Sequence, residues 1–95
     1  MGAVNKAELT VEVASRAGLS RSEATRAVDA VWETIERVLG DGGDVSIAGF
    51  GKFHVGVRAA RAGVNPRTGE PIQIASSRVP RFTAGTGLKG AVRGR

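Results

Sequence analysis

The sequence predicts an α+β fold, in which a helical hairpin precedes an antiparallel sheet and a long β-hairpin projects from that sheet. Over residues 5–40 apolar residues recur at helical spacing, and from Val45 onward they alternate with polar ones as in a half-buried strand. Later in the chain, Asn65-Pro66-Arg67-Thr68-Gly69 has the composition of a turn between two strands. The 95 residues allow one domain at most, and we expect residues 1–95 to form it.

Two capped helices are expected at the start of the chain. Asn5 and Glu8 have the spacing of a capping box, and Ser20 and Glu23 repeat it. Apolar residues at helical spacing follow each box: Leu9, Val13 and Ala17 after the first, and Ala24, Ala27, Val28, Val31, Ile35, Val38 and Leu39 after the second. Because a glycine follows each run, we expect both helices to stop there and to form a helical hairpin.

A DNA-reading helix-turn-helix is a weaker interpretation of the same hairpin. Its second helix would have to be basic, whereas residues 21–40 carry four acids against three arginines. Trp32 lies among these acids, so we interpret it as a core or interface residue and not as a platform for a nucleobase.

A three-stranded antiparallel sheet is expected after the helices. Val45 and Ile47 alternate with small residues, and the run Phe53, Val55, Val57 alternates with Lys52, His54, Gly56 and Arg58. Between the two runs, Gly49-Phe50-Gly51 allows a tight turn around an aromatic side chain. His54 has no second His or Cys to share a metal, so it is interpreted as a solvated side chain or a phosphate contact.

The end of the chain should close the sheet and then form a short helix. Val79-Pro80-Arg81-Phe82 reads as the last strand, and Pro80 should mark a strand end or an edge because it cannot donate a ladder hydrogen bond. Leu88 and Val92 then predict a short amphipathic helix, although three nearby glycines weaken it.

The arm is expected to span residues 58–78, with the body formed by residues 1–57 and 79–95. We expect the hairpin to lack a hydrophobic face, because its first strand is small and charged. This stretch alone fits an arm that reaches for an anionic partner and an ordinary surface hairpin equally well. Arg58 and Arg61 differ by three positions, so a regular strand would place them on opposite faces. If both contact the same groove, a bulge is expected near Ala59 or Ala60.

Composition points to a partner subunit and to a polyanion. There is no cysteine, and a body of about seventy residues is marginal for one chain alone, so a second subunit is the expected source of further burial. Residues 1–48 hold five basic and eight acidic residues, whereas residues 49–95 hold nine basic residues and only Glu70 as an acid. This polarity favours nucleic acid over an acidic membrane, because no amphipathic basic helix accompanies the charge.

Other features of the sequence argue against several classes of protein. No apolar run is long enough for a membrane span or a signal peptide, so a cytosolic location is the default expectation. We find no paired carboxylates, activated nucleophile, metal ligands or phosphate-cradling loop, so we expect no enzyme activity, cofactor, metal or small-molecule substrate.

The order of these features resembles the bacterial histone-like HU and integration host factor family. The resemblance runs from Asn5-Lys6-Ala7-Glu8-Leu9 to Val92 and includes the glycine-phenylalanine turn, the proline-tipped arm and Leu88-Lys89. It implies an intertwined homodimer, or a heterodimer with a paralogue, whose two arms enter the minor groove of double-stranded DNA. It also implies that the proline at each tip kinks the duplex, in a nucleoid architectural protein of the bacterial cytoplasm that condenses DNA.

The resemblance also implies roles for individual residues. The DNA-binding positions of the arm match Arg58, Arg61, Asn65, Pro66, Arg67 and Arg78. Positions of the body where phosphate contact is expected match Lys6, Lys52 and Lys89, and the dimer core matches Phe50, Phe53 and Phe82. The sequence departs from the family at Val64, where arginine is usual, and at Thr83 and Thr86, where many relatives carry Lys or Arg.

Three interpretations remain open beside sequence-tolerant DNA bending. Site-specific bending, closer to integration host factor, would need base or shape discrimination that a single sequence does not display. An enzyme acting on nucleic acid lacks catalytic residues, and an interaction module without DNA would not need the acids to be excluded from half the chain.

Overall fold

The computed structural model describes residues 2–94 and divides the chain into two compact units near the end of the second helix, Met1–Arg37 and Val38–Arg95. The first unit contains α1 (Lys6–Ala17) and most of α2 (Arg21–Gly40). The second unit contains all five strands and the C-terminal helix.

Both helices begin at the predicted capping boxes. The Asn5 side chain accepts a hydrogen bond from the Glu8 amide at 2.8 Å, and the Ser20 hydroxyl accepts one from the Glu23 amide at 3.1 Å. In return the Glu23 carboxylate accepts from the Ser20 amide at 2.8 Å, and this hydrogen bonding lowers the pKa of Glu23. Gly18 ends α1 in the left-handed conformation (φ +67°), as expected of a glycine stop.

The helical hairpin buries few hydrophobic side chains. Among residues 2–94 the buried hydrophobic side chains are limited to Ala24, Val28 and Ile35, all on the predicted apolar face of α2. Val31 and Trp32 on the same helix remain 51% and 38% exposed. The apolar stripe of α2 is therefore wider than the surface that α1 covers, as expected of a helix that packs on a further element.

The sheet has the order β1-β2-β5 and is antiparallel throughout. Its strands are β1 (Val45–Ile47), β2 (Gly51–Arg58) and β5 (Ser77–Ala84). Pro80 pairs with Val55 within β5, which is an outer strand. The expectation that Pro80 lies at an edge is thus confirmed, because the outer side of β5 needs no donor from it.

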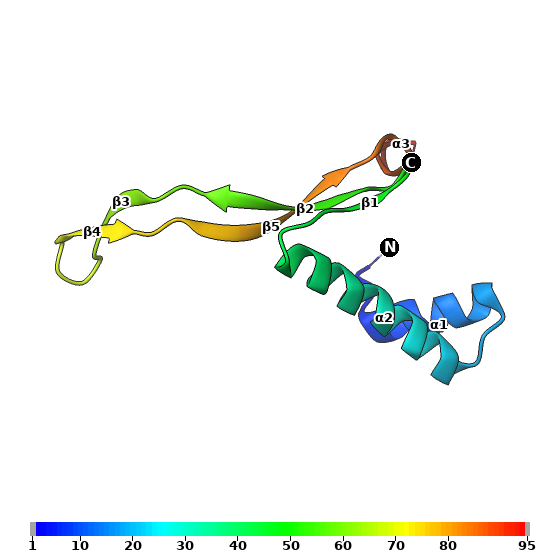
Figure 1. Ribbon diagram of the computed structural model, residues 1–95. Coiled ribbons are helices and arrows are strands. Elements are labelled where there is room, and N and C mark those ends of the chain that lie inside the picture. The colour runs from blue at the N-terminus through cyan, green and yellow to red at the C-terminus, as the bar shows by residue number, and fades with distance from the viewer. Residues whose placement is uncertain (1, 95) are drawn as a thin grey trace. The chain divides into compact units, whose positions relative to one another are not determined.

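The arm continues β2 and β5 as a separate two-stranded ladder (Figure 1). It consists of β3 (Arg61–Val64) and β4 (Pro71–Ile74), and the turn between them forms the tip. Residues 59–60 and 75–76 interrupt the ladder between the sheet and the arm.

The interruption is not the bulge that the arginine spacing led us to expect. Arg58 pairs with Ser77 before it and Arg61 pairs with Ile74 after it. Two residues are therefore unpaired on each strand and the register is unchanged, whereas a bulge requires an extra residue on one strand. The bulge prediction was wrong for the described residues, because both strands leave the ladder together.

The arm also has a small apolar face, which the first strand alone did not suggest. Arg61 and Gly63 share a face with Ile72 and Ile74 of the opposite strand. A Cβ at Gly63 would meet the Ile74 side chain at 2.8 Å, so the missing side chain leaves room for isoleucine to cross the hairpin. The prediction that the arm lacks a hydrophobic face was wrong because these contacts come from β4.

Backbone hydrogen bonds join the start of the C-terminal helix α3 (Thr86–Arg93) to the turn between β1 and β2. The Gly85 amide donates to the Phe50 carbonyl at 2.7 Å, and the Leu88 amide donates to the Gly49 carbonyl at 3.1 Å. A Cβ at Gly87 would lie 2.6 Å from the Gly49 carbonyl oxygen. Glycines that weaken the helix by propensity therefore permit this close approach of two backbones.

Candidate nucleic-acid interface

The arm tip is a preorganised turn. The Asn65 side chain accepts a hydrogen bond from the Arg67 amide at 2.9 Å. The backbone carbonyl of Asn65 accepts another from the Gly69 amide at 2.8 Å. Gly69 has φ +74°, the left-handed conformation that returns the chain. Pro66 and Arg67 are exposed between these bonds. The tip thus presents a rigid apolar ring beside a cation.

A basic face lies on the polar side of the sheet. We define it as the side chains of Lys52, His54, Arg58 and Arg81, which the antiparallel register places on one side of β2 and β5. The His54 Nε2 atom lies 2.9 Å from the Thr83 hydroxyl on the same side. Arg81 was not among the predicted site residues. The alternation of β5 would have identified it, since residues opposite β2's polar positions must share its polar face.

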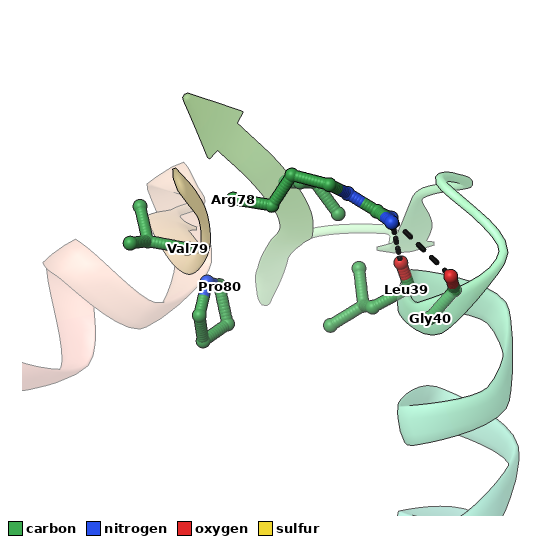
Figure 2. Close-up of a pocket in the computed structure, with 6 residues that line it drawn as sticks. Leu39, Gly40, Arg78, Val79 and Pro80 are labelled. Carbon is green, nitrogen blue, oxygen red and sulfur yellow. Dashed lines mark hydrogen bonds between the residues drawn. The ribbon is translucent and has the colours of Figure 1, made fainter. Parts of the chain in front are cut away.

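Arg78 lies on the other face of the sheet and contacts the end of α2 (Figure 2). Its Nη2 atom donates to the carbonyl oxygens of Leu39 at 3.1 Å and Gly40 at 3.3 Å. A cation at the C-terminal end of a helix satisfies carbonyls that lack a partner and interacts favourably with the helix dipole. The structure therefore shows an intramolecular contact for this predicted DNA-binding residue.

Two of the three predicted phosphate-binding lysines form ion pairs within the chain. Lys6 pairs with Asp29, and this hydrogen-bonded contact raises the pKa of Lys6. Lys52 lies 3.2 Å from Asp44. Lys89 is exposed on α3, where it borders an apolar hollow together with Arg93. All three ammonium groups are at least half exposed or lie at the surface, so a phosphate can compete for them.

The three phenylalanines form one cluster. The ring centroid of Phe82 lies 4.8 Å from that of Phe53 and 5.7 Å from that of Phe50. Phe50 and Phe82 nevertheless remain 43% and 42% exposed. The same face of the sheet carries Ile47 and Val57, which are 42% and 67% exposed. Exposed apolar side chains that gather on one face of a small protein are typical of an interface.

The described residues contain neither a cluster of metal ligands nor a helix that could span a membrane. Across residues 2–94, His, Cys, Asp and Glu side chains do not gather in groups of three or more that could hold a metal ion. Within the same residues, each helix is too short or too polar to span a bilayer.

The family follows from comparison with known proteins. The model of the family described as bacterial DNA-binding protein matches residues 4–93. This chain belongs to that family. Its function is accordingly DNA binding, and it is not an enzyme.

Individual members of the bacterial DNA-binding protein family are similar over almost their whole length. DNA-binding protein HRm of Rhizobium meliloti is 53% identical over 89 residues, which cover 94% of this chain and 99% of that protein. DNA-binding protein HU of Geobacillus stearothermophilus is 50% identical over 90 residues, which cover 95% of this chain and all of that protein.

Solved structures of family members share the fold. The HU–DNA cocrystal structure from Anabaena superposes with a TM-score of 0.88 at 38% identity, covering 94% of this chain and 97% of that one. HU from Thermotoga maritima superposes with a TM-score of 0.68 at 31% identity, covering 94% and 98% of the two chains. The α+β fold with helices at both ends of an antiparallel sheet is therefore confirmed.

Proposed function

We propose that this protein binds double-stranded DNA with little sequence preference and bends it, as a dimer whose two arms enter the minor groove. The observation that carries the proposal is the arm tip, where hydrogen bonds fix Pro66 at the end of a hairpin with little side-chain bulk. A rigid apolar wedge suits insertion between base pairs, which unstacks them and kinks the duplex. Membership of the DNA-binding family, and similarity to a protein crystallised with DNA, support the same partner.

The proposed contacts divide between arm and body. On the arm we assign minor-groove and tip contacts to Arg58, Arg61, Asn65, Pro66, Arg67 and Arg78. On the body we assign phosphate contacts to Lys6, Lys52 and Lys89. For Arg78 the contact requires its guanidinium to serve a phosphate as well as the carbonyls of α2, which its five donors permit.

The dimer is proposed from the exposed apolar surface. Phe50, Phe53 and Phe82 form its core, because a second subunit would cover rings that one chain leaves in water. We propose that residues 1–95 act as one DNA-binding domain, with the arm at 58–78, and that the protein resides in the nucleoid of the bacterial cytoplasm. The arrangement serves a homodimer or a heterodimer with a paralogue.

The test is duplex binding at several salt concentrations. If phosphates supply most of the affinity, log K should fall linearly with log salt, with a slope of about 0.9 for each phosphate neutralised. Arg58→Ala and Arg61→Ala should each weaken binding to different duplexes by similar factors and reduce the slope by about one.

Two outcomes would contradict the proposal. Binding that is insensitive to salt would exclude a phosphate-driven complex. If either arginine variant changed the preference among DNA sequences while the slope of log K against log salt stayed the same, that arginine would read bases, as in site-specific bending.

A further inference from the structure

We propose that Arg81 is an additional phosphate-binding residue of the DNA interface and that Gly56 provides the space in which its side chain lies. The proposal rests on the proposed DNA-binding function and adds a residue of β5 to it. Neither residue is among the DNA-binding positions assigned above, although the alternation of β5 places Arg81 on the polar face of the sheet.

The first observation is the close approach of the two residues. A Cβ at position 56 would lie 2.5 Å from Cδ and 2.9 Å from Cζ of Arg81, and it would overlap Nε. These atoms are the last methylene carbon of the arginine side chain and two atoms of its guanidinium group. The side chain therefore crosses the sheet over the backbone of Gly56, a path that any larger residue there would block.

The second observation is that the side chains on the same face of the sheet as Arg81 are basic or neutral. It pairs with His54 across the ladder, and the register places it on the basic face with Lys52 and Arg58. The remaining positions on that face of the sheet are neutral: Ser46, Ser77, Val79 and Thr83. Asp44 is the acid that reaches Lys52, and among the described residues it forms no ion pair with Arg81.

The third observation is that the chain uses its other structural arginines differently. Arg16 pairs with Glu12 at 3.0 Å, and Arg78 donates to the carbonyls that end α2. Within residues 2–94, Arg81 makes neither an ion pair nor a side-chain hydrogen bond. An exposed guanidinium held in place by packing, with its donors unused, is prepared for a phosphate oxygen.

A purely structural role is the alternative. The stem of Arg81 could simply cover the strand where Gly56 has no side chain, since long basic residues often bury their methylenes on a surface. That role depends on the methylenes and not on the charge. It predicts a loss of stability in a truncated variant but no change in how DNA affinity responds to salt.

The experiment compares charge with packing at position 81. Full-length wild type, Arg81→Gln, Arg81→Lys and the control Arg26→Gln, which removes an exposed charge from α2, would be titrated with one intact duplex. We expect Arg81→Gln to lower the slope of log K against log salt by about 0.9. The ratio of wild-type to variant affinity should then grow about threefold as salt falls from 200 mM to 50 mM. Arg81→Lys and Arg26→Gln should keep the wild-type slope.

A double-mutant cycle tests whether Gly56 provides the space for the Arg81 side chain. Gly56→Ala should weaken binding in the wild type, because the methyl group displaces the arginine. In an Arg81→Ala background the same change should have no further effect, since no long side chain remains to be displaced. Circular dichroism and thermal unfolding would verify that each variant is folded, and Arg81→Gln provides the charge test if Gly56→Ala does not fold.

The outcomes separate this proposal from the one on which it rests. If wild type shows a steep salt dependence and Arg81→Gln has the same slope, Arg81 makes no phosphate contact although the protein binds DNA as proposed. If Gly56→Ala lowers DNA affinity equally with and without Arg81, Gly56 does not position the Arg81 side chain. If wild type itself shows no salt-dependent binding to the duplex, both proposals are overturned.

Discussion

Some arginines of this protein are held by contacts within the chain, whereas others have exposed side chains that a ligand can reach. Arg78 donates to two backbone carbonyls at the end of α2, so part of its hydrogen-bonding capacity is used in the fold. Arg67 at the arm tip is exposed, and only its backbone amide is engaged, by the Asn65 side chain. The difference matters for affinity, because a cation with unused donors gives up less on binding a phosphate.

Val64 provides a test at the residue scale. It is 64% exposed on the arm directly before Asn65. Val64→Arg should tighten duplex binding at low salt by about 1 kcal/mol, the size typical of one Lys or Arg near an anionic surface, and the gain should fade as salt rises. Anisotropy titrations at two salt concentrations would measure it. An unchanged affinity at low salt would mean that Val64 lies away from the DNA.

At the scale of elements, local sequence predicted most of what the structure shows. Capping boxes at Asn5 and Ser20, the glycine stop at Gly18 and the turn at Asn65 all act over a few residues, so their signals are readable in order along the chain. The edge position of Pro80 followed from the missing amide.

Contacts between distant segments were not predictable in the same way. The bonds of Arg78 to Leu39 and Gly40 join residues nearly forty positions apart, and the pairing of Lys6 with Asp29 depends on how α1 packs on α2. Nothing in the neighbouring residues signals such partners. The expected bulge failed for a similar reason: the spacing of two arginines on one strand contains no information on where the opposite strand leaves the ladder.

The glycines of α3 allow a matched pair of variants. Gly87→Ala should destabilise the protein, because its Cβ would lie 2.6 Å from the Gly49 carbonyl oxygen. Gly90→Ala should stabilise it by about 0.5–1 kcal/mol, because no atom lies within 4 Å of the added Cβ and alanine favours the helix. Urea unfolding of both variants would measure the two effects. If both variants changed the free energy of unfolding equally and with the same sign, helix propensity and not contact with Gly49 would determine the effect.

At the scale of the whole molecule, too little apolar surface is buried for an isolated chain. No side chain within residues 2–94 is both large and fully buried, while Trp32, Phe50 and Phe82 are each about two-fifths exposed. A body of about seventy residues without a disulfide is marginal as an isolated chain, and a partner subunit would complete its core.

The dimer makes a quantitative prediction. The unfolding midpoint should rise with protein concentration, because association stabilises the folded state by mass action. Phe50→Ala should cost about 3–5 kcal/mol, because the dimer would bury a ring that is 43% exposed in the single chain. Val4→Ala, at an exposed position before α1, should cost little. Thermal unfolding over a range of concentrations would measure both, and sedimentation of a folded monomer at micromolar concentration would contradict the dimer.

In the proposed complex, Pro66 bends DNA by entering the base stack. Energy transfer between the ends of a labelled duplex would be measured for wild type, Pro66→Ala and the control Pro71→Ala, which removes the other proline of the same arm. Because unstacking costs a few kcal/mol per step, we expect Pro66→Ala to reduce the bend more than the affinity on intact DNA. On a nicked duplex, where unstacking is already easy, it should bind nearly as well as wild type. An equal loss of affinity on intact and nicked DNA, with the bend unchanged, would contradict the claim and leave Pro66 as a residue that only stiffens the turn.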